Sequence, residues 1–234
     1  MPRDRKGITR KSSGQYEDPA KFFVVAAEGT ETEYQYFEQI SIHITRLQLS
    51  HLVKVEPLKR EDTKSDFRRV IRQLDDYRRK YMLNADDELW CLIDRDRILP
   101  KNASEAGRLC RQKKYEFCLS SPCFEIWLLL HIKDLTDFTR DELQELLENR
   151  KTTASKTVLE HTLNEATKTV LGKAYHKNNP PPELLQYLPI AIHRAFLNQL
   201  DTKHWTLTDF CTRVHVLVQR IFKAELPDYK IPLI

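Results

Sequence analysis

The chain has 234 residues, of which 41% are hydrophobic and 31% charged, so it can form at least one compact core and is not disordered throughout. The formal net charge is +4, and residues 1–14 alone carry five basic side chains against one acidic side chain. The rest of the chain is therefore electrically balanced, and its net charge gives no reason to expect an acidic partner for the folded part.

Two further classes of protein are disfavoured. No run approaches the roughly 18 apolar residues of a membrane span, and the basic start of the chain lacks the apolar segment of a secretory signal. We therefore expect a cytoplasmic protein that does not associate with a membrane. The five cysteines form no C-x-x-C pair, so we expect reduced, packed thiols rather than zinc ligands or disulfides.

Short apolar runs alternate with helical periodicities along the first half of the chain. The segments typical of strands are the apolar runs 22–27, 89–93 and 116–119 and the segment 52–58, which alternates apolar with polar residues. Helical spacing occurs between them at 30–49, 66–82 and 104–115. Strands separated by helices pair in parallel, because a parallel pair needs a crossover connection. The predicted fold class is therefore α/β, with a mostly parallel four-stranded sheet flanked by helices.

From residue 124 onward only helical patterns follow. They cover 124–132, 141–149, 156–171, 183–200 and 208–222, with turn residues or prolines between them. We predict a flexible basic leader (1–19), an α/β domain (20–122) and a helical region (123–234) packed on that domain. The chain contains neither G-x-x-x-x-G-K-[ST] nor G-x-G-x-x-G, so nothing supports a nucleotide site of those types.

Carboxylates follow two of the predicted strands. Glu28 comes after the first strand, and Asp94-Arg95-Asp96 comes after the third. Ligands of open α/β sheets bind outside the carboxyl ends of the strands. In an extended stretch residues two apart point the same way, so we expect Asp94 and Asp96 to converge while Arg95 turns away. Such a pair suits Mg²⁺ or Mn²⁺, although D-x-D after a strand is also an ordinary turn or helix-cap signal.

The helix predicted at 124–132 is apolar apart from two residues. Glu125 would be costly to bury there unless it accepts hydrogen bonds or binds a ligand. His131 follows six residues later, so the two side chains need not meet. His131 is either an accessory site residue or a structural histidine whose hydrogen bonds are satisfied in the core.

Two basic clusters remain within the balanced part of the chain. Residues 59–80 and 101–114 each carry a net charge of +4. Such clusters are either solvated helix faces or a track for a phosphate backbone. For the second interpretation we select Arg68 and Arg72 as candidate phosphate contacts.

Three motifs, in this order and at these separations, resemble those of the RloB family. They are Glu28-Gly29-(x)2-Thr32-Glu33-(x)2-Tyr36-Phe37, then Asp94-Arg95-Asp96, then Ser121-Pro122-Cys123-Phe124-Glu125-Ile126-Trp127-Leu128-Leu129-Leu130-His131. Similarity beyond residue 132 is limited to Tyr175-His176-Lys177 and to residues 212–218. Proteins of this family are associated with bacterial phage-defence loci, commonly beside an AAA/ABC-type ATPase, and resemble Toprim-domain nucleases.

The resemblance implies a Toprim-like sheet and assigns roles to the residues that match the motifs. Glu28 and Glu125 become candidate catalytic carboxylates. The implied ligands of Mg²⁺ or Mn²⁺ are Asp94, Asp96, Glu28 and Glu33, with Glu33 selected over Glu31 because it stands at the family's position. Lys177 becomes a candidate phosphate contact, with a solvated lysine before a turn as the ordinary alternative.

These observations lead to a main hypothesis and two alternatives. The main one is a Mg²⁺-dependent endonuclease that cleaves RNA, with tRNA as one candidate, or DNA, as an effector of anti-phage defence. The first alternative is a catalytically silent subunit that binds nucleic acid or an ATPase. The second, phosphotransfer on a small molecule, is weaker, because a haloacid-dehalogenase-like nucleophile would be expected where this chain has Glu28. Whether the chain forms a homo-oligomer stays open.

Overall fold

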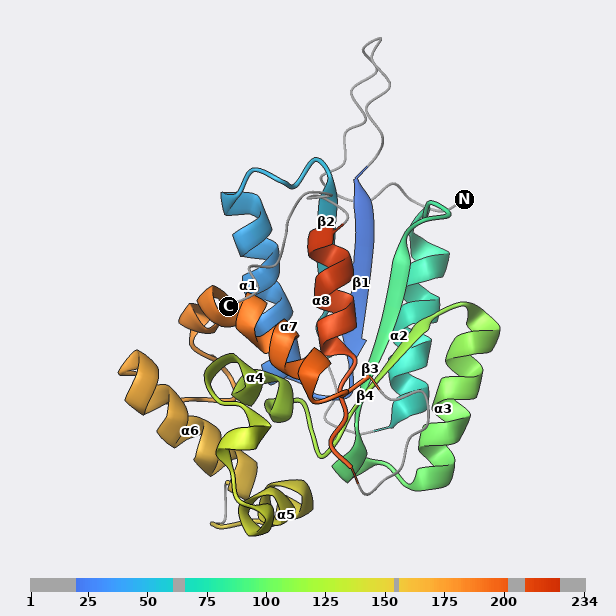
Figure 1. The fold of residues 1–234 in the computed structure, drawn as a ribbon. Helices are drawn as coiled ribbons and strands as arrows, with labels where there is room; N and C mark the ends of the chain where they lie inside the picture. Colours follow the sequence, from blue (N-terminus) through green and yellow to red (C-terminus); the bar gives the residue numbers. More distant parts are fainter. Residues whose placement is uncertain (1–19, 61–65, 154–155, 202–208, 224–234) are drawn as a thin grey trace.

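A four-stranded, all-parallel sheet lies at the centre of the molecule (Figure 1). The computed structural model describes residues 20–60, 66–153, 156–201 and 209–223. The strands, in the order β2-β1-β3-β4, are β1 (Lys21–Ala27), β2 (Val53–Leu58), β3 (Glu88–Asp94) and β4 (Glu116–Ser120). The predicted four-stranded α/β sheet is thus confirmed.

Helices cover both faces of the sheet. On one face lie α1 (Thr32–Arg46) and α8 (Val214–Lys223), and on the other lie α2 (Phe67–Lys80) and α3 (Pro100–Lys113) (Figure 1). Strand side chains alternate between these faces, so Val25 packs in the core with α1 while Val24 packs in the core with α2 and α3. The two central strands, β1 and β3, are buried on both faces and are apolar apart from their ends, whereas the edge strand β2 alternates buried valines with the more exposed Lys54 and Glu56.

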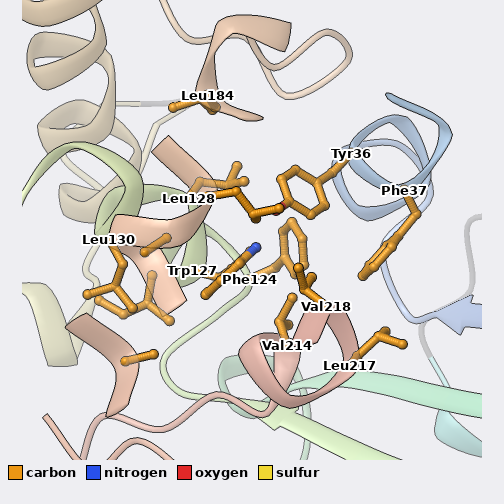
Figure 2. Packing of buried hydrophobic residues seen from close by; sticks show 14 of the residues in the cluster. Tyr36, Phe37, Phe124, Trp127, Leu128, Leu130, Leu184, Val214, Leu217 and Val218 are labelled. Carbon is orange, nitrogen blue, oxygen red and sulfur yellow. The ribbon is translucent and has the colours of Figure 1, made fainter. Parts of the chain in front are cut away.

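The second half of the chain is helical. Besides α8, its helices are α4 (Glu125–Ile132), α5 (Arg140–Glu148), α6 (Val158–Leu171) and α7 (Leu188–Leu197). Two short 3₁₀ turns, η2 (Leu135–Asp137) and η3 (Pro182–Tyr187), lie between them. A third, η1 (Arg95–Arg97), follows β3 in the first half. The central helix is α4, which is buried from Glu125 to His131. Figure 2 shows Phe124 and Trp127 packed near Tyr36 of α1 and Val218 of α8. One core therefore runs from the sheet into the helical half.

Three predicted helices differ clearly from those observed, and one of them, predicted at 104–115, begins four residues earlier at Pro100. A single helix over 183–200 is wrong, because η3 and α7 divide this segment. Pro189 lies in the first turn of α7, where a proline needs no hydrogen-bonded N–H, so it starts a helix there rather than continuing one. The last helix begins at Val214 rather than at residue 208, and Cys211 before it forms an antiparallel bridge with Ser121.

Helix α8 is fixed over β3 and β4 by two arginines. Arg220 Nη1 donates to Glu88 at 3.0 Å and to Glu116 at 2.8 Å, and its guanidinium lies 5.4 Å from the centroid of the Trp90 indole. Arg213 lies 5.8 Å from the same ring and donates to the Phe117 carbonyl at 2.7 Å. These cation–π contacts and ion pairs hold the C-terminal helix against the sheet.

Several predictions concern features outside this core. The basic leader (1–19) and residues 61–65 of the first basic cluster lie outside the described residues, and the division into domains stays a prediction. All five cysteines are free and buried. In the part of the chain that the structure describes, no helix has the length and apolarity needed to cross a lipid bilayer.

The packing of α8 predicts that truncating a buried leucine of this helix lowers the free energy of unfolding much more than truncating an exposed phenylalanine of α7. Leu217 is fully buried in the core, so Leu217→Ala should lower the free energy of unfolding by about 2–5 kcal/mol in urea titrations. Phe196 at the end of α7 is 72% exposed, so Phe196→Ala should change it by less than about 0.5 kcal/mol. Equal costs for the two substitutions would contradict this packing.

Candidate active site at the carboxyl edge of the sheet

The order of the strands reverses between β1 and β3. The chain passes from β1 to β2 on one side and then crosses to β3 on the other side. Glu28, directly after β1, donates its backbone N–H to the Leu92 carbonyl of β3 at 2.9 Å. Open α/β sheets bind ligands at this switch point, outside the carboxyl ends of the strands. Glu28 and Asp94, which ends β3, therefore lie where the fold favours a site.

The loop after β1 brings a second carboxylate back onto the backbone. Glu33 Oε1 accepts the N–H of Gly29 at 3.2 Å, and both Glu28 and Glu33 are buried, with exposed fractions of 3% and 5%. A Cβ on Gly29 would lie 2.1 Å from Glu33 Oε2, so this approach requires glycine. Glu33 stands in the first turn of α1, where the helix dipole favours a negative charge. Glu31 is instead the N-cap residue of α1 and is partly exposed.

The Asp94-Arg95-Asp96 segment is not extended, and the prediction that it continues the strand is wrong. Strand β3 ends at Asp94, and the next three residues form η1, closed by a bond from the Ile98 N–H to the Arg95 carbonyl at 3.2 Å. Alternation along a strand therefore does not set the direction of Asp96. Asp94 is buried and Asp96 is exposed, and Arg95 turns away to bond with the helical half.

The Cys123 thiol indicates which carboxylates share one region. Burial raises the pKa of Cys123 well above its usual value, and the charges of Glu125, Asp94 and Asp96 raise it further. The turn after β3 and the start of α4 therefore face the same region around this thiol. Asn149 also reaches it, with Nδ2 3.4 Å from Sγ.

Glu28 has a different electrostatic neighbour. The pKa of Cys91 is raised well above its usual value by a hydrogen bond with Cys110 and by burial, and Glu28 adds to this shift. Cys91 belongs to the core beneath α2 and α3, whereas Cys123 belongs to the core beneath α1. The charge of Glu28 therefore acts on a thiol of the core beneath α2 and α3.

A lysine and two buried carboxylates form a cluster at the start of α4 and α6. Tyr175 Oη donates to Glu125 Oε1 at 3.0 Å, and Lys177 Nζ lies 3.9 Å from the same oxygen while it forms an ion pair with Glu160. Burial, and then Glu125, raises the pKa of Tyr175 well above its usual value. Sequence reasoning missed Glu160, because its pattern with Thr157 indicates only a capping box, which the structure also contains.

His131 is a structural histidine within the core. Its ring is fully buried, and Nδ1 lies 3.0 Å from the Trp127 carbonyl, which can only accept a hydrogen bond. Nδ1 therefore carries the proton, and Nε2 accepts the Tyr36 hydroxyl at 3.2 Å. Burial lowers the pKa of His131 to about 4. Its hydrogen bonds in the structure favour the structural interpretation of this residue over the accessory one.

The basic residues of α2 lie on its solvent side. Arg68 forms an ion pair with Glu105 of α3 at 3.0 Å, and Arg72 is exposed one turn further along α2. The first turn of α2 lies toward the carboxyl edge, because α2 follows the carboxyl end of β2. Arg60, in the loop before α2, donates to the backbone carbonyl of Glu28. Basic side chains therefore extend from Glu28 onto the outer face of α2.

The carboxylate oxygens at this edge are ligands of the kind that a hard cation such as Mg²⁺ prefers. Among residues 20–60, 66–153, 156–201 and 209–223, no three Asp, Glu, His or Cys side chains are grouped so as to hold a metal ion. Mg²⁺ is commonly held by one or two carboxylates, with water and substrate phosphates as its other ligands. The carboxylates of Asp94, at the end of β3, and Asp96, in η1, fit this limited role in their chemistry.

Comparison with known proteins identifies a family for most of the chain. The family model described as RloB-like protein matches residues 23–221, a range that contains every candidate site residue named above. No curated protein and no solved structure gives a significant match.

The contact between Gly29 and Glu33 predicts a change at the site with little change in stability. Gly29→Ala should displace the flexible Glu33 carboxylate, lower the affinity for Mn²⁺ several-fold in calorimetric titrations, and change the unfolding free energy by less than about 1 kcal/mol. The control is Gly172→Ala at the end of α6, where φ is +66° and no atom would meet the new Cβ. It should cost about 1 kcal/mol and leave Mn²⁺ affinity unchanged. Wild-type Mn²⁺ affinity in Gly29→Ala would refute the arrangement.

Burial of neutral His131 predicts a loss of stability in acid. Its pKa of about 4 in the folded chain lies below the usual 6.5, so between these values the unfolded chain binds more protons. The contribution is complete above pH 6.5 and is lost as the pH falls toward 4. Urea titrations should show the wild type losing about 3 kcal/mol more than His131→Gln over this range. Parallel stability curves for the two proteins would contradict a buried neutral histidine.

Proposed function

The chain belongs to the RloB-like family, and from its buried carboxylates we propose that it is a divalent-metal-dependent nuclease. The observation that carries the proposal is the burial of four carboxylates that follow or end strands of the sheet: Glu28, Glu33, Asp94 and Glu125 are each no more than 5% exposed. Buried carboxylates are costly unless hydrogen bonds or cations compensate them. Glu28 and Asp94 lie at the switch point, where a bound cation would offset this cost.

The proposed roles follow from the position of each side chain. Asp94 and Asp96 would hold Mg²⁺ or Mn²⁺ with Glu33 as an accessory ligand, and the ion would polarise a phosphoryl oxygen. Glu28 would take the proton of the attacking water or supply one to the leaving oxygen. Because Glu28 is buried, bulk water has little access to its carboxylate.

The basic side chains of Lys177 and Arg68 would contact the phosphate backbone of the substrate. The Lys177 side chain is 42% exposed, so its ammonium can contact a phosphate while Glu125 and Glu160 keep it in place. We assign Glu125 to this supporting role beside its candidate catalytic role, because it accepts the Tyr175 hydroxyl and lies near Lys177. The Arg68–Glu105 pair is half-exposed and worth less than about 1 kcal/mol, so a phosphate can replace Glu105.

The cellular role is part of the same proposal. The motifs that resemble the RloB family support an effector of bacterial anti-phage defence that acts on RNA, including tRNA, or on DNA. The same resemblance supports an AAA/ABC-type ATPase as a partner. We propose no choice between RNA and DNA, since the basic residues of α2 would contact phosphates, which both share.

A second function is favoured by one observation. Because no three ligand-type side chains are grouped within the described residues, the chain also fits a catalytically silent subunit that binds nucleic acid or an ATPase. The two functions differ in metal binding. Clear Mn²⁺ binding by the wild type that is lost in the double variant Asp94→Asn/Asp96→Asn supports the nuclease, and its absence in the wild type supports the silent subunit.

Conservative substitution of the carboxylates tests the nuclease. In the presence of Mg²⁺, the full-length chain should cleave at least one of tRNA, single-stranded RNA and duplex DNA. Glu28→Gln and Asp94→Asn should each lower the cleavage rate by about 100-fold or more. Glu31→Gln, an equal loss of charge at the N-cap of α1, should stay within about threefold of the wild type. Undiminished cleavage by both site variants would eliminate the assignment.

A further inference from the structure

Arg95 lies in the chain between the two proposed metal ligands but bonds to other elements. Its Nε donates to Ser121 Oγ at 3.3 Å, and its Nη2 donates to the backbone carbonyl of Leu147 at 2.8 Å. Ser121 follows β4, and Leu147 is in the last turn of α5. One half-buried guanidinium thus connects the turn after β3 to a neighbouring strand end and to the helical half.

The contact with α5 is chemically favourable. The last carbonyls of a helix have no partner within the helix, and the helix dipole makes that end negative. A guanidinium satisfies such a carbonyl and keeps further N–H groups for a second acceptor, which a lysine ammonium on a flexible stem does less well. At Leu147 and Ser121 the arginine uses both properties.

The turn that carries Asp96 depends on such external bonds. Turn η1 has only three residues, and a 3₁₀ turn of this length contributes little stability of its own. Besides its closing bond, its backbone is held by the N–H of Asp96, which donates to the Pro122 carbonyl at 3.1 Å. The bond from Arg95 to Ser121 and this backbone bond tie the turn to the same segment, residues 121–122.

We propose that Arg95 is a positioning residue for the cation site, which sets the relation between Asp94 and Asp96 by fixing η1 to Ser121 and to the end of α5. The inference rests on the proposed function in so far as these two aspartates hold the ion. It also gives the helical half a direct effect on the site, because α5 supplies one of the two acceptors.

Charge and position predict opposite effects of removing Arg95. A positive charge beside two carboxylates opposes the binding of a cation, so loss of that charge alone would tighten binding. Loss of the two hydrogen bonds would loosen η1 and weaken binding, because a ligand pair that is not preorganised must be ordered when the ion binds. The direction of the change in Mn²⁺ affinity therefore separates the two roles.

The experiment is a calorimetric titration of the full-length chain with Mn²⁺. Arg95→Met should raise the Kd for Mn²⁺ about 10-fold or more, consistent with the 10–100-fold effects of residues that orient metal ligands. Arg95→Lys should also raise it, since the charge remains but the two bonds do not. The control is Arg150→Met, which removes an exposed arginine of the same charge two residues after α5, paired with Glu148, and should stay within about twofold.

Ser121→Ala provides a test that keeps the charge and does not depend on folding of the Arg95 variants. It removes one acceptor of Arg95 and should raise the Kd for Mn²⁺ about threefold or more. Unchanged or tighter Mn²⁺ binding in Arg95→Met, or in Ser121→Ala where Arg95→Met does not fold, would overturn the inference. Absence of Mn²⁺ binding in the wild type would overturn it as well, whereas Mn²⁺ binding without cleavage would defeat only the nuclease proposal.

Discussion

The burial of negative charge at one edge of a parallel sheet is the constraint on which the rest of the structure depends. Parallel strands place all their carboxyl ends together, and two of the four carboxyl ends here carry an acidic residue that water hardly reaches: Glu28 directly after β1 and Asp94 at the end of β3. Each such carboxylate pays a desolvation cost that the fold must offset locally. The arrangement of loops, helix starts and basic side chains around the edge can be understood as the means of doing so.

The helical half supplies much of that compensation. Helix α4 begins at the edge with Glu125, whose carboxylate accepts the Tyr175 hydroxyl and lies near the Lys177 ammonium. The last turn of α5 receives the Arg95 guanidinium from the turn after β3. The apolar core of α4 continues the core beneath α1 and α8, so these polar contacts lie beside closely packed apolar side chains (Figure 2). The helical half therefore contacts the candidate site directly through Glu125 and Leu147.

Sequence reasoning succeeded where a local pattern has one structural meaning. Continuous apolar runs bounded by helical periodicity gave the sheet, and the carboxyl-edge rule located Glu28 and Asp94. It failed where competing local bonds decide the outcome. The D-x-D segment was expected to be extended, but the hydrogen bond between Ile98 and Arg95 closes η1 instead.

Long-range partners could not be predicted at all. The ion pair of Lys177 with Glu160 joins residues whose patterns indicate a turn and a helix cap, and nothing in either pattern indicates the other.

The measurement that tests the central claim most directly is thermal unfolding of the full-length chain as a function of Mn²⁺ concentration. If the buried carboxylates bind a cation, the Tm of the wild type rises with the logarithm of Mn²⁺ concentration above the Kd, and that rise disappears in Asp94→Asn. A wild-type Tm that is independent of Mn²⁺, or an equal rise in Asp94→Asn, would contradict the account.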